Sequence, residues 1–183
     1  MILLTTSRRP TRRIRTLCHD FVRSVPNIVR INRGKLNLDG VAERAIELNA
    51  NRIVVIERWK AGPGKIKLFR IEQDGLVTVP PVMYVAGVRL RREFEANPER
   101  IRSFMVTMEP ENRTETIRIA EHLSGFFNLP MLSIDEAATK YQVSMHVSLD
   151  ASRRTQITFM FLPQMVEIGP RITLSKLVWE VPL

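Results

Sequence analysis

The chain has 183 residues, enough for one domain or two small ones, and its 44% hydrophobic and 26% charged content excludes a disordered chain. The longest uncharged stretch, residues 75–88, is too short to cross a bilayer and contains two prolines, so we expect a soluble protein without a membrane partner. The net charge of +9 points instead to a polyanionic partner.

Nearly all of the excess positive charge lies in the first 35 residues. That segment holds nine basic side chains and one acidic side chain, Asp20, whereas the other 148 residues hold 19 basic and 18 acidic ones. An ordinary solvated surface mixes both signs. Arginine outnumbers lysine eight to one in this segment, and it forms paired hydrogen bonds with phosphate. The distribution predicts a polyanion-binding surface, although charge alone does not distinguish RNA from DNA or an acidic protein.

The chain begins with a predicted strand, residues 2–5, that leads into a basic helix. Thr6-Ser7 are plausible caps for this helix, and Pro10 suits its first turn. The apolar residues of the helix recur at helical spacing and predict one core-facing side: Ile14, Leu17, Cys18, Phe21 and Val25. Arginines cover the opposite side: Arg8, Arg12, Arg15 and Arg23. An arginine-rich start is also typical of a mitochondrial presequence, but the strand before it argues against one.

Further strands and a second helix complete the first half. A strand at 28–31 is followed by the basic turn Asn32–Lys35 and by a helix at 38–49. This helix is expected to face the core with Val41, Ala45, Ile46 and Leu48. The remaining elements are a buried strand at 52–58 (RIVVIER), a turn at 61–64, a hairpin partner at 65–71 and an extended segment at 76–88.

The second half repeats this order about one hundred residues later. It contains a predicted strand at 104–108, a turn at 109–112, a helix at 114–127, a strand at 131–134 and three antiparallel strands at 142–149, 154–162 and 171–181. We therefore predict an α/β fold with two pseudo-repeated halves, residues 1–87 and 88–183, each a mixed sheet with packed helices, that together form one domain.

The sequence lacks the motifs of common catalytic sites. Gly62–Lys65 lacks the first glycine and the final Ser or Thr of a phosphate-binding loop, so a hairpin turn is the better interpretation. The histidines, His19, His122 and His146, lack metal-ligand spacing, although His19 lies on the arginine side of its helix. Cys18 is the single cysteine, which predicts a buried thiol and a reducing compartment. We expect no metal, no cofactor and no enzymatic activity.

Two local features bear on nucleic-acid binding. Trp59, between Arg58 and Lys60, could stack on a base or simply close the end of its strand, and the sequence leaves both open. The first turn of the basic helix adds free amide groups and a helix dipole, which also favour phosphate.

Three segments resemble the Brix-domain family of ribosome-biogenesis factors. Residues 4–11 (LTTSRRPT) are similar to that family's first strand and basic turn, Asn32–Lys35 to its basic loop, and residues 168–174 (IGPRITL) to its Gly-Pro-Arg signature. The resemblance covers essentially the whole chain, in the same order, and is closest to the branch that acts in early processing of small-subunit rRNA. The chain starts at its first predicted strand and ends just after its last, as expected of a minimal archaeal form.

The resemblance implies both a fold and a function. Each half should be similar to the anticodon-binding domain of class IIa tRNA synthetases. The protein should bind pre-ribosomal RNA and assembly proteins in the cytoplasm, without catalysing a reaction. A tRNA-binding accessory module is the alternative function, and a nuclease or RNA-modifying enzyme is a third that the missing motifs disfavour.

The Gly-Pro-Arg segment has its own physical interpretation. Gly169 permits a bend, Pro170 starts a strand without losing a ladder bond, and Arg171 either contacts RNA or holds the two halves together through a carboxylate, the structural role being favoured. The candidate RNA-binding residues are Arg8, Arg9, Arg12, Arg13, Arg15, Arg33, Lys35, Trp59 and Arg171.

Overall fold

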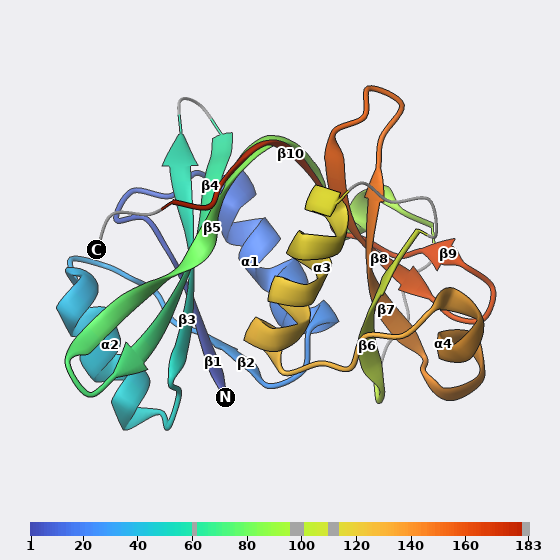
Figure 1. Cartoon of the computed structure of the whole chain (residues 1–183). Helices are drawn as coiled ribbons and strands as arrows, with labels where there is room; N and C mark the ends of the chain where they lie inside the picture. The colour runs from blue at the N-terminus through green and yellow to red at the C-terminus, as the bar shows by residue number, and fades with distance from the viewer. Residues whose placement is uncertain (60–61, 96–100, 110–113, 181–183) are drawn as a thin grey trace. The chain divides into compact units, whose positions relative to one another are not determined.

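The computed structural model describes residues 1–59, 62–95, 101–109 and 114–180. The chain forms two compact units (Figure 1). The first comprises Met1–Val85 and the chain from Lys176 onward, and the second comprises Ala86–Ser175. Two strands, β5 (Gly75–Arg89) and β10 (Arg171–Val178), each run from one unit into the other, so the carboxyl-terminal residues return to the first unit.

The first unit is built on a mixed sheet. Strand β1 (Ile2–Thr6) pairs in parallel with both β2 (Ile28–Arg30) and β3 (Arg52–Trp59). Strand β3 then forms an antiparallel hairpin with β4 (Gly62–Glu72), which pairs with β5, so the order is β2-β1-β3-β4-β5. The predicted strands and the hairpin of this half are confirmed, and the predicted turn at residues 61–64 lies partly outside the described residues.

Helix α1 (Arg12–Ser24) covers one face of this sheet. The predicted core side is confirmed, since all five of its members, Cys18 included, are buried. The predicted start is wrong. Thr6 stays in β1 and pairs with Ile56, Ser7 continues with a backbone bond to Ile56, and Thr11 caps the helix by accepting a hydrogen bond from the amide of Ile14. Pro10 therefore lies before the helix, not in its first turn.

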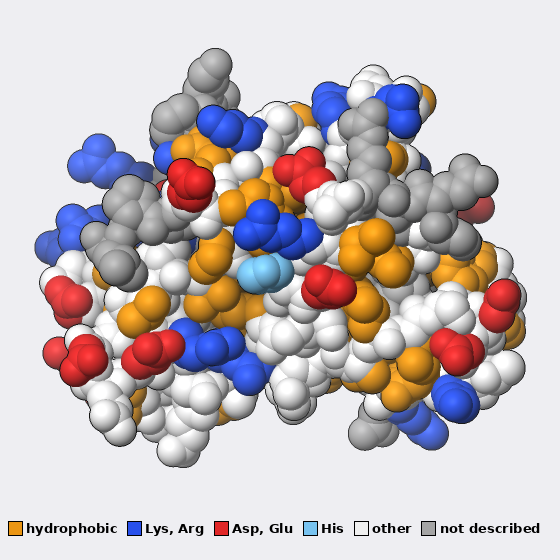
Figure 2. Space-filling view, in the orientation of Figure 1, with side chains coloured by type: hydrophobic (Ala, Val, Ile, Leu, Met, Phe, Trp, Pro, Cys, Tyr) orange, Lys and Arg blue, Asp and Glu red, His pale blue; other side chains and the backbone are white. Residues whose placement is uncertain are grey.

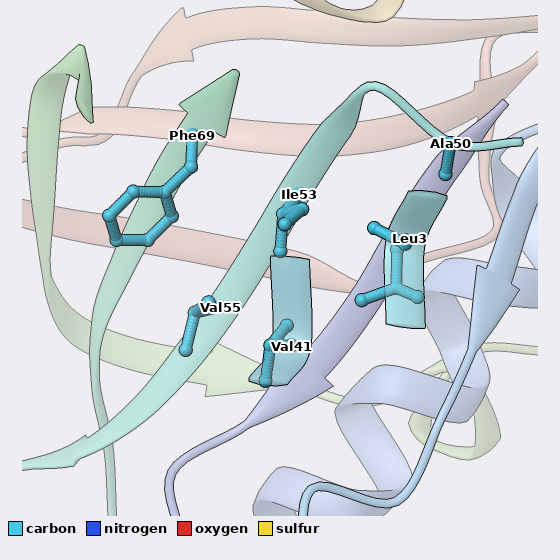
Figure 3. Close-up of a cluster of buried hydrophobic side chains, with 7 residues drawn as sticks. Leu3, Val41, Ala50, Ile53, Val55 and Phe69 are labelled. Atoms are coloured by element: carbon cyan, nitrogen blue, oxygen red, sulfur yellow. The ribbon is translucent and has the colours of Figure 1, made fainter. Parts of the chain in front are cut away.

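Helix α2 (Leu38–Glu47) covers the opposite face, with Asn37 as its cap (Figure 1). Val41 and Ala45, one turn apart, pack there against alternate residues of the strands, with Leu3, Ala50, Ile53, Val55 and Phe69 in the same cluster (Figure 3). The assignment of Ile46 to this core is wrong, because its side chain is 60% exposed. A residue one position beyond Ala45 is rotated by about 100° away from the sheet.

The second unit also has a mixed sheet, in the order β10-β8-β7-β6. Strand β6 (Phe104–Met108) is parallel to β7 (Val143–Leu149), which pairs antiparallel with β8 (Thr155–Phe161). Strand β8 pairs antiparallel with β10 and with the short β9 (Val166–Glu167). Helix α3 (Thr114–Phe127) has the predicted bounds, and a 3₁₀ turn spans Arg91–Glu93. The turn predicted at 109–112 lies mostly outside the described residues.

One element of the second unit differs from its prediction. Residues 131–134 do not form a strand, since Met131 makes only an isolated bridge to Val106. Helix α4 (Ile134–Lys140) follows instead. Ser133 and Glu136 form a capping box, in which the Ser133 hydroxyl accepts from the Glu136 amide and the Glu136 carboxylate accepts from the Ser133 amide. This box starts the helix and ends the extended segment.

No helix in the described part of the chain combines the length and the apolar character needed to cross a membrane.

Candidate nucleic-acid interface

The parallel strands of the first unit end at one edge of its sheet. Because β1 is parallel to β2 and β3, the chain that leaves each of these strands emerges on the same side. We call this the carboxyl edge, and its residues are Ser7–Arg13 after β1, Asn32–Lys35 after β2, and Arg58 near the end of β3. Two hydrogen bonds connect the chain after β1 to β3: the Ser7 amide donates to the Ile56 carbonyl, and the Arg58 amide donates to Ser7 Oγ at 3.2 Å.

Six basic side chains at the carboxyl edge are exposed: Arg8, Arg9, Arg12, Arg13, Lys35 and Arg58. In Figure 2, Lys and Arg side chains project at the upper left of the first unit, where β1 and β3 end in Figure 1. Arg15 is also exposed and follows Arg12 by three positions, which places it on the same side of α1. The sheet therefore gathers charges from three separate segments of the sequence at one edge.

The amino terminus of α1 adds to the positive character of the carboxyl edge. Its first turn contains no acidic residue, and Arg12 and Arg13 occupy its first two positions. The exposed amide groups of a first turn carry partial positive charge, which adds to that of the arginines. An anion at this edge would meet both kinds of group.

Arg33, a candidate contact, is placed differently from its neighbours. Its residue exposure is 9%, and its guanidinium donates from Nε to the Leu36 carbonyl at 3.0 Å and from Nη1 to the Thr6 carbonyl at 3.3 Å. Burial lowers the pKa of Arg33, the nearby charge of Arg8 lowers it further, and Glu57 raises it. The structure thus brings Arg33 to the carboxyl edge but directs its hydrogen bonds to backbone carbonyls.

Arg30 links the carboxyl edge to the middle of α1. Its Nη2 donates to Asn32 Oδ1 at 2.8 Å, and its Nη1 lies 3.3 Å from His19 Nε2. His19 is exposed and lies on the arginine side of α1, as the helical spacing predicts. Neither Arg30 nor Arg58 is singled out by the sequence motifs. The sequence signal for Arg58 is its position at the carboxyl end of a buried run, since polar residues at the ends of such strands often face a ligand.

Trp59 is the last residue of β3, but its side chain lies outside the described residues, so both interpretations of it stay predictions.

Arg171 belongs to the second unit, unlike the other candidates. It forms an ion pair with Glu167, in which Nε donates to Oε1 at 2.6 Å, and its guanidinium lies over the Phe94 ring at 5.7 Å. A carboxylate partner is therefore present, and it lies four residues away in the same unit. The hydrogen bond to Glu167 raises the pKa of Arg171.

Gly169 sits directly under the Phe94 ring. A Cβ at this position would come closer to two ring carbons than real Cβ atoms come, and the residue has a φ of +62°. Arg89 covers the Phe94 ring with its guanidinium carbon 4.3 Å from the centroid. The Gly-Pro-Arg segment is thus packed around one aromatic side chain of the second unit.

A polar cluster is buried between β6 and β7 of the second unit. Thr107 Oγ1 donates to Ser144 Oγ at 3.0 Å and lies 2.9 Å from His146 Nδ1. The two hydroxyls and the imidazole nitrogen thus satisfy one another inside the sheet, and the His146 tautomer sets which of them donates. Burial lowers the pKa of His146, against the opposing charges of Glu109 and Glu167.

The described residues contain no group of three or more His, Cys, Asp or Glu side chains arranged to hold a metal ion. Cys18 is buried in the core, and this burial raises its thiol pKa to about 12. A thiol in this state does not act as a nucleophile at neutral pH.

Comparison with known proteins identifies the family. No protein-family model matches the chain. A probable Brix domain-containing ribosomal biogenesis protein from Aeropyrum pernix is 31% identical over 178 residues, and the match covers 94% of both chains. The chain belongs to the family of Brix domain-containing ribosomal biogenesis proteins. The predicted family is thereby confirmed.

Other archaeal members of the family match part of the chain. The proteins from Pyrococcus horikoshii and Pyrococcus abyssi, which carry the same description, are 34% and 36% identical over 93 residues. Each of these matches covers 51% of this chain and 41% of the Pyrococcus protein, so this chain spans less than half of those relatives.

Two solved structures have a similar fold. The crystal structure of a probable ribosomal biogenesis protein from Aeropyrum pernix superposes with a TM-score of 0.78 at 25% identity, over 97% of this chain and 98% of the other. That of an archaeal Imp4-like protein gives 0.65 at 17% identity, over 98% and 100%. The mixed α/β fold is therefore that of the Brix family.

Proposed function

We propose that this protein binds pre-ribosomal RNA through the carboxyl edge and acts in ribosome assembly by holding RNA in place. The single observation that carries the proposal is the convergence of exposed arginine and lysine side chains from three segments at this edge. Family membership supplies the ribosome-biogenesis role, and the charge supplies a reason to expect RNA as the ligand.

The chemistry of the carboxyl edge suits a phosphate backbone more than a specific base. Guanidinium groups pair with phosphate oxygens in a fixed geometry, and the first turn of α1 presents amide donors beside them. Such contacts position RNA without reading its sequence. We therefore expect binding that depends strongly on salt and weakly on sequence.

The finer parts of the function rest on the family resemblance. We propose that the bound RNA is the small-subunit precursor, that the protein acts in the cytoplasm together with assembly proteins, and that it catalyses no step. Incubation of the pure protein with precursor RNA should leave the RNA intact, and cleavage or base modification would contradict the last point.

The alternative function, a tRNA-binding accessory module, is less well supported, because the relatives described above are named as ribosomal biogenesis proteins. Crosslinking in cells, followed by sequencing of the bound RNA, separates the two functions. The proposal predicts enrichment of reads from precursor rRNA with crosslinks at the carboxyl edge. Enrichment of tRNA without precursor rRNA would favour the alternative.

We also propose that the two units are repeats of one arrangement. Support comes from their connectivity: in each unit a first strand pairs in parallel with the strand that follows two helices, and that strand pairs antiparallel with the next one. Superposition of β1, α1, β3 and β4 on β6, α3, β7 and β8 in a crystal structure should place equivalent Cα atoms together. The similarity to class IIa anticodon-binding domains stays a prediction.

A further inference from the structure

Arg33 stands out at the carboxyl edge because its charge is buried while the neighbouring charges are exposed. Placing a guanidinium inside a protein is unfavourable unless hydrogen bonds and favourable charges compensate. Here the compensation comes from two carbonyls on different segments, Leu36 in the chain after β2 and Thr6 at the end of β1. The side chain thus bridges two of the three segments that make up this edge.

The third segment contributes through charge. Glu57, in β3, raises the pKa of Arg33, and the Glu57 carboxylate also pairs with Lys67 Nζ at 3.2 Å. Arg8, in the chain after β1, acts in the opposite direction and repels Arg33. Arg33 therefore lies within electrostatic range of the chain after β1 and of β3, and the repulsion from Arg8 is present whenever no anion is bound.

We infer that Arg33 is a positioning residue of the carboxyl edge: it holds the Asn32–Lys35 turn against the end of β1, so that Lys35 and Arg8 reach the same stretch of RNA backbone. The inference rests on the proposed function for its ligand and deepens it. The exposed neighbours make the phosphate contacts, and Arg33 acts through them.

The two hydrogen bonds use a property of arginine that lysine lacks. Nε and Nη1 of a planar guanidinium point to two different carbonyls at once. A lysine keeps the positive charge, but its single nitrogen on a flexible stem does not hold both carbonyls in the fixed planar geometry of a guanidinium. Arg33→Lys therefore separates the two roles, because it keeps a charge for phosphate and loses the rigid link between the turn and the end of β1.

The test compares wild type with Arg33→Lys, Arg33→Ala and Lys35→Ala for binding to single-stranded precursor rRNA fragments across salt concentrations. Each phosphate contact adds about −0.7 to the slope of the logarithm of the binding constant against the logarithm of the salt concentration, which corresponds to about fourfold in affinity at 0.15 M salt. Lys35→Ala should lose about that much. Arg33→Lys should lose two contacts or more, with binding at least about tenfold weaker and a slope flatter by about 1.4, despite its retained charge.

Hydrogen exchange gives a readout that does not depend on RNA. The Leu36 amide donates to the Arg33 carbonyl at 3.1 Å within the turn, and it should exchange faster in Arg33→Lys than in Lys35→Ala. Unchanged melting temperature and exchange in β1 and β3 would show that the variant is folded.

The outcomes separate the inference from the proposed function. Binding by Arg33→Lys within twofold of wild type, or a loss in Arg33→Ala equal to that in Lys35→Ala, would overturn the positioning role while leaving RNA binding intact. A wild-type protein that binds no RNA would overturn the proposed function. The positioning role of Arg33 would then be tested by the exchange rate of the Leu36 amide alone. An unchanged exchange rate in Arg33→Lys would refute that role.

Discussion

Gly169 shows how one residue type can be required for two independent reasons. Its positive φ is strained for any side chain, and the Phe94 ring occupies the space that a Cβ would take. The sequence predicts the bend but not the aromatic neighbour, because Phe94 lies 75 positions earlier in the chain. Only the folded structure brings these two residues together, so local sequence patterns do not predict the contact.

Gly169→Ala should therefore destabilise the protein by about 2–4 kcal/mol, the sum of backbone strain and overpacking. Gly34→Ala is the matched control, because Gly34 has a φ of +54° but no atom within 4 Å of the position of a Cβ. It should lose about 1 kcal/mol, from strain alone. Urea denaturation of both variants measures the difference. Equal losses would contradict the role of Phe94, and Phe94→Ala should recover part of the loss in the Gly169→Ala background.

His146 is the residue whose titration should be visible in stability. Its folded-state pKa lies below the ordinary value of 6.5, because burial disfavours the charged ring. Between the two values the unfolded chain binds more protons than the folded one, so stability falls as pH decreases through 6.5 toward the folded pKa. Thermal unfolding at pH 7.5 and 5.5 should show this loss, and His146→Asn should reduce it. If the melting temperature of the wild-type protein rose on acidification while that of His146→Asn did not, the lowered pKa of His146 would be contradicted.

At the scale of elements, strongly periodic segments were predictable and their ends were less so. The core side of α1, the bounds of α3 and the buried run of β3 follow from apolar spacing. The start of α1 was misplaced, because Thr6, Ser7 and Thr11 are all suitable caps and tertiary pairing of β1 with β3 decides among them. Helix α4 was missed, although the capping box of Ser133 and Glu136 was present in the sequence.

The cap of α1 gives a direct test at this scale. Thr11→Ala removes the hydroxyl that accepts from the Ile14 amide and should destabilise the protein by about 1 kcal/mol. Thr16 is the matched control: it lies inside the same helix, and its hydroxyl donates to the Arg12 carbonyl at an exposed position. Thr16→Ala should be neutral or slightly stabilising, since alanine favours helix. Chemical denaturation compares the two, and an equal effect of both substitutions would contradict Thr11 as the cap.

Across the whole molecule, the sequence predicted which segments are basic but not how the sheet arranges them. Ser7 and Arg58 are 51 positions apart in the sequence and are hydrogen-bonded because β1 and β3 pair in parallel. The sequence does not distinguish Arg33 from its exposed basic neighbours. Its side chain is nevertheless buried, because its guanidinium donates hydrogen bonds to two backbone carbonyls. Arg171 forms its ion pair with Glu167, four residues earlier in the chain. The Gly-Pro-Arg motif alone did not distinguish such a local pair from a long-range one.

The arrangement of the first unit also supplies a matched set of charges at its opposite edge. Arg23 lies in the last turn of α1 and Arg44 in the last turn of α2. Arg70, in β4, lies opposite the first residue of β3 in the strand register. These three arginines are exposed, as are Arg8, Arg9 and Arg12 at the carboxyl edge. Replacing either set by alanine removes the same charge from the same unit, so a difference between the two variants reports position and not net charge.

The salt dependence of RNA binding by these two triple variants tests the central claim most directly. Loss of Arg8, Arg9 and Arg12 should flatten a wild-type log–log slope of about −3 to −4 by about two units and weaken binding about 50-fold at 0.15 M salt. Loss of Arg23, Arg44 and Arg70 should leave the slope unchanged and affinity within about twofold, because charges beyond a Debye length are screened. Equal losses in both variants would contradict binding at the carboxyl edge.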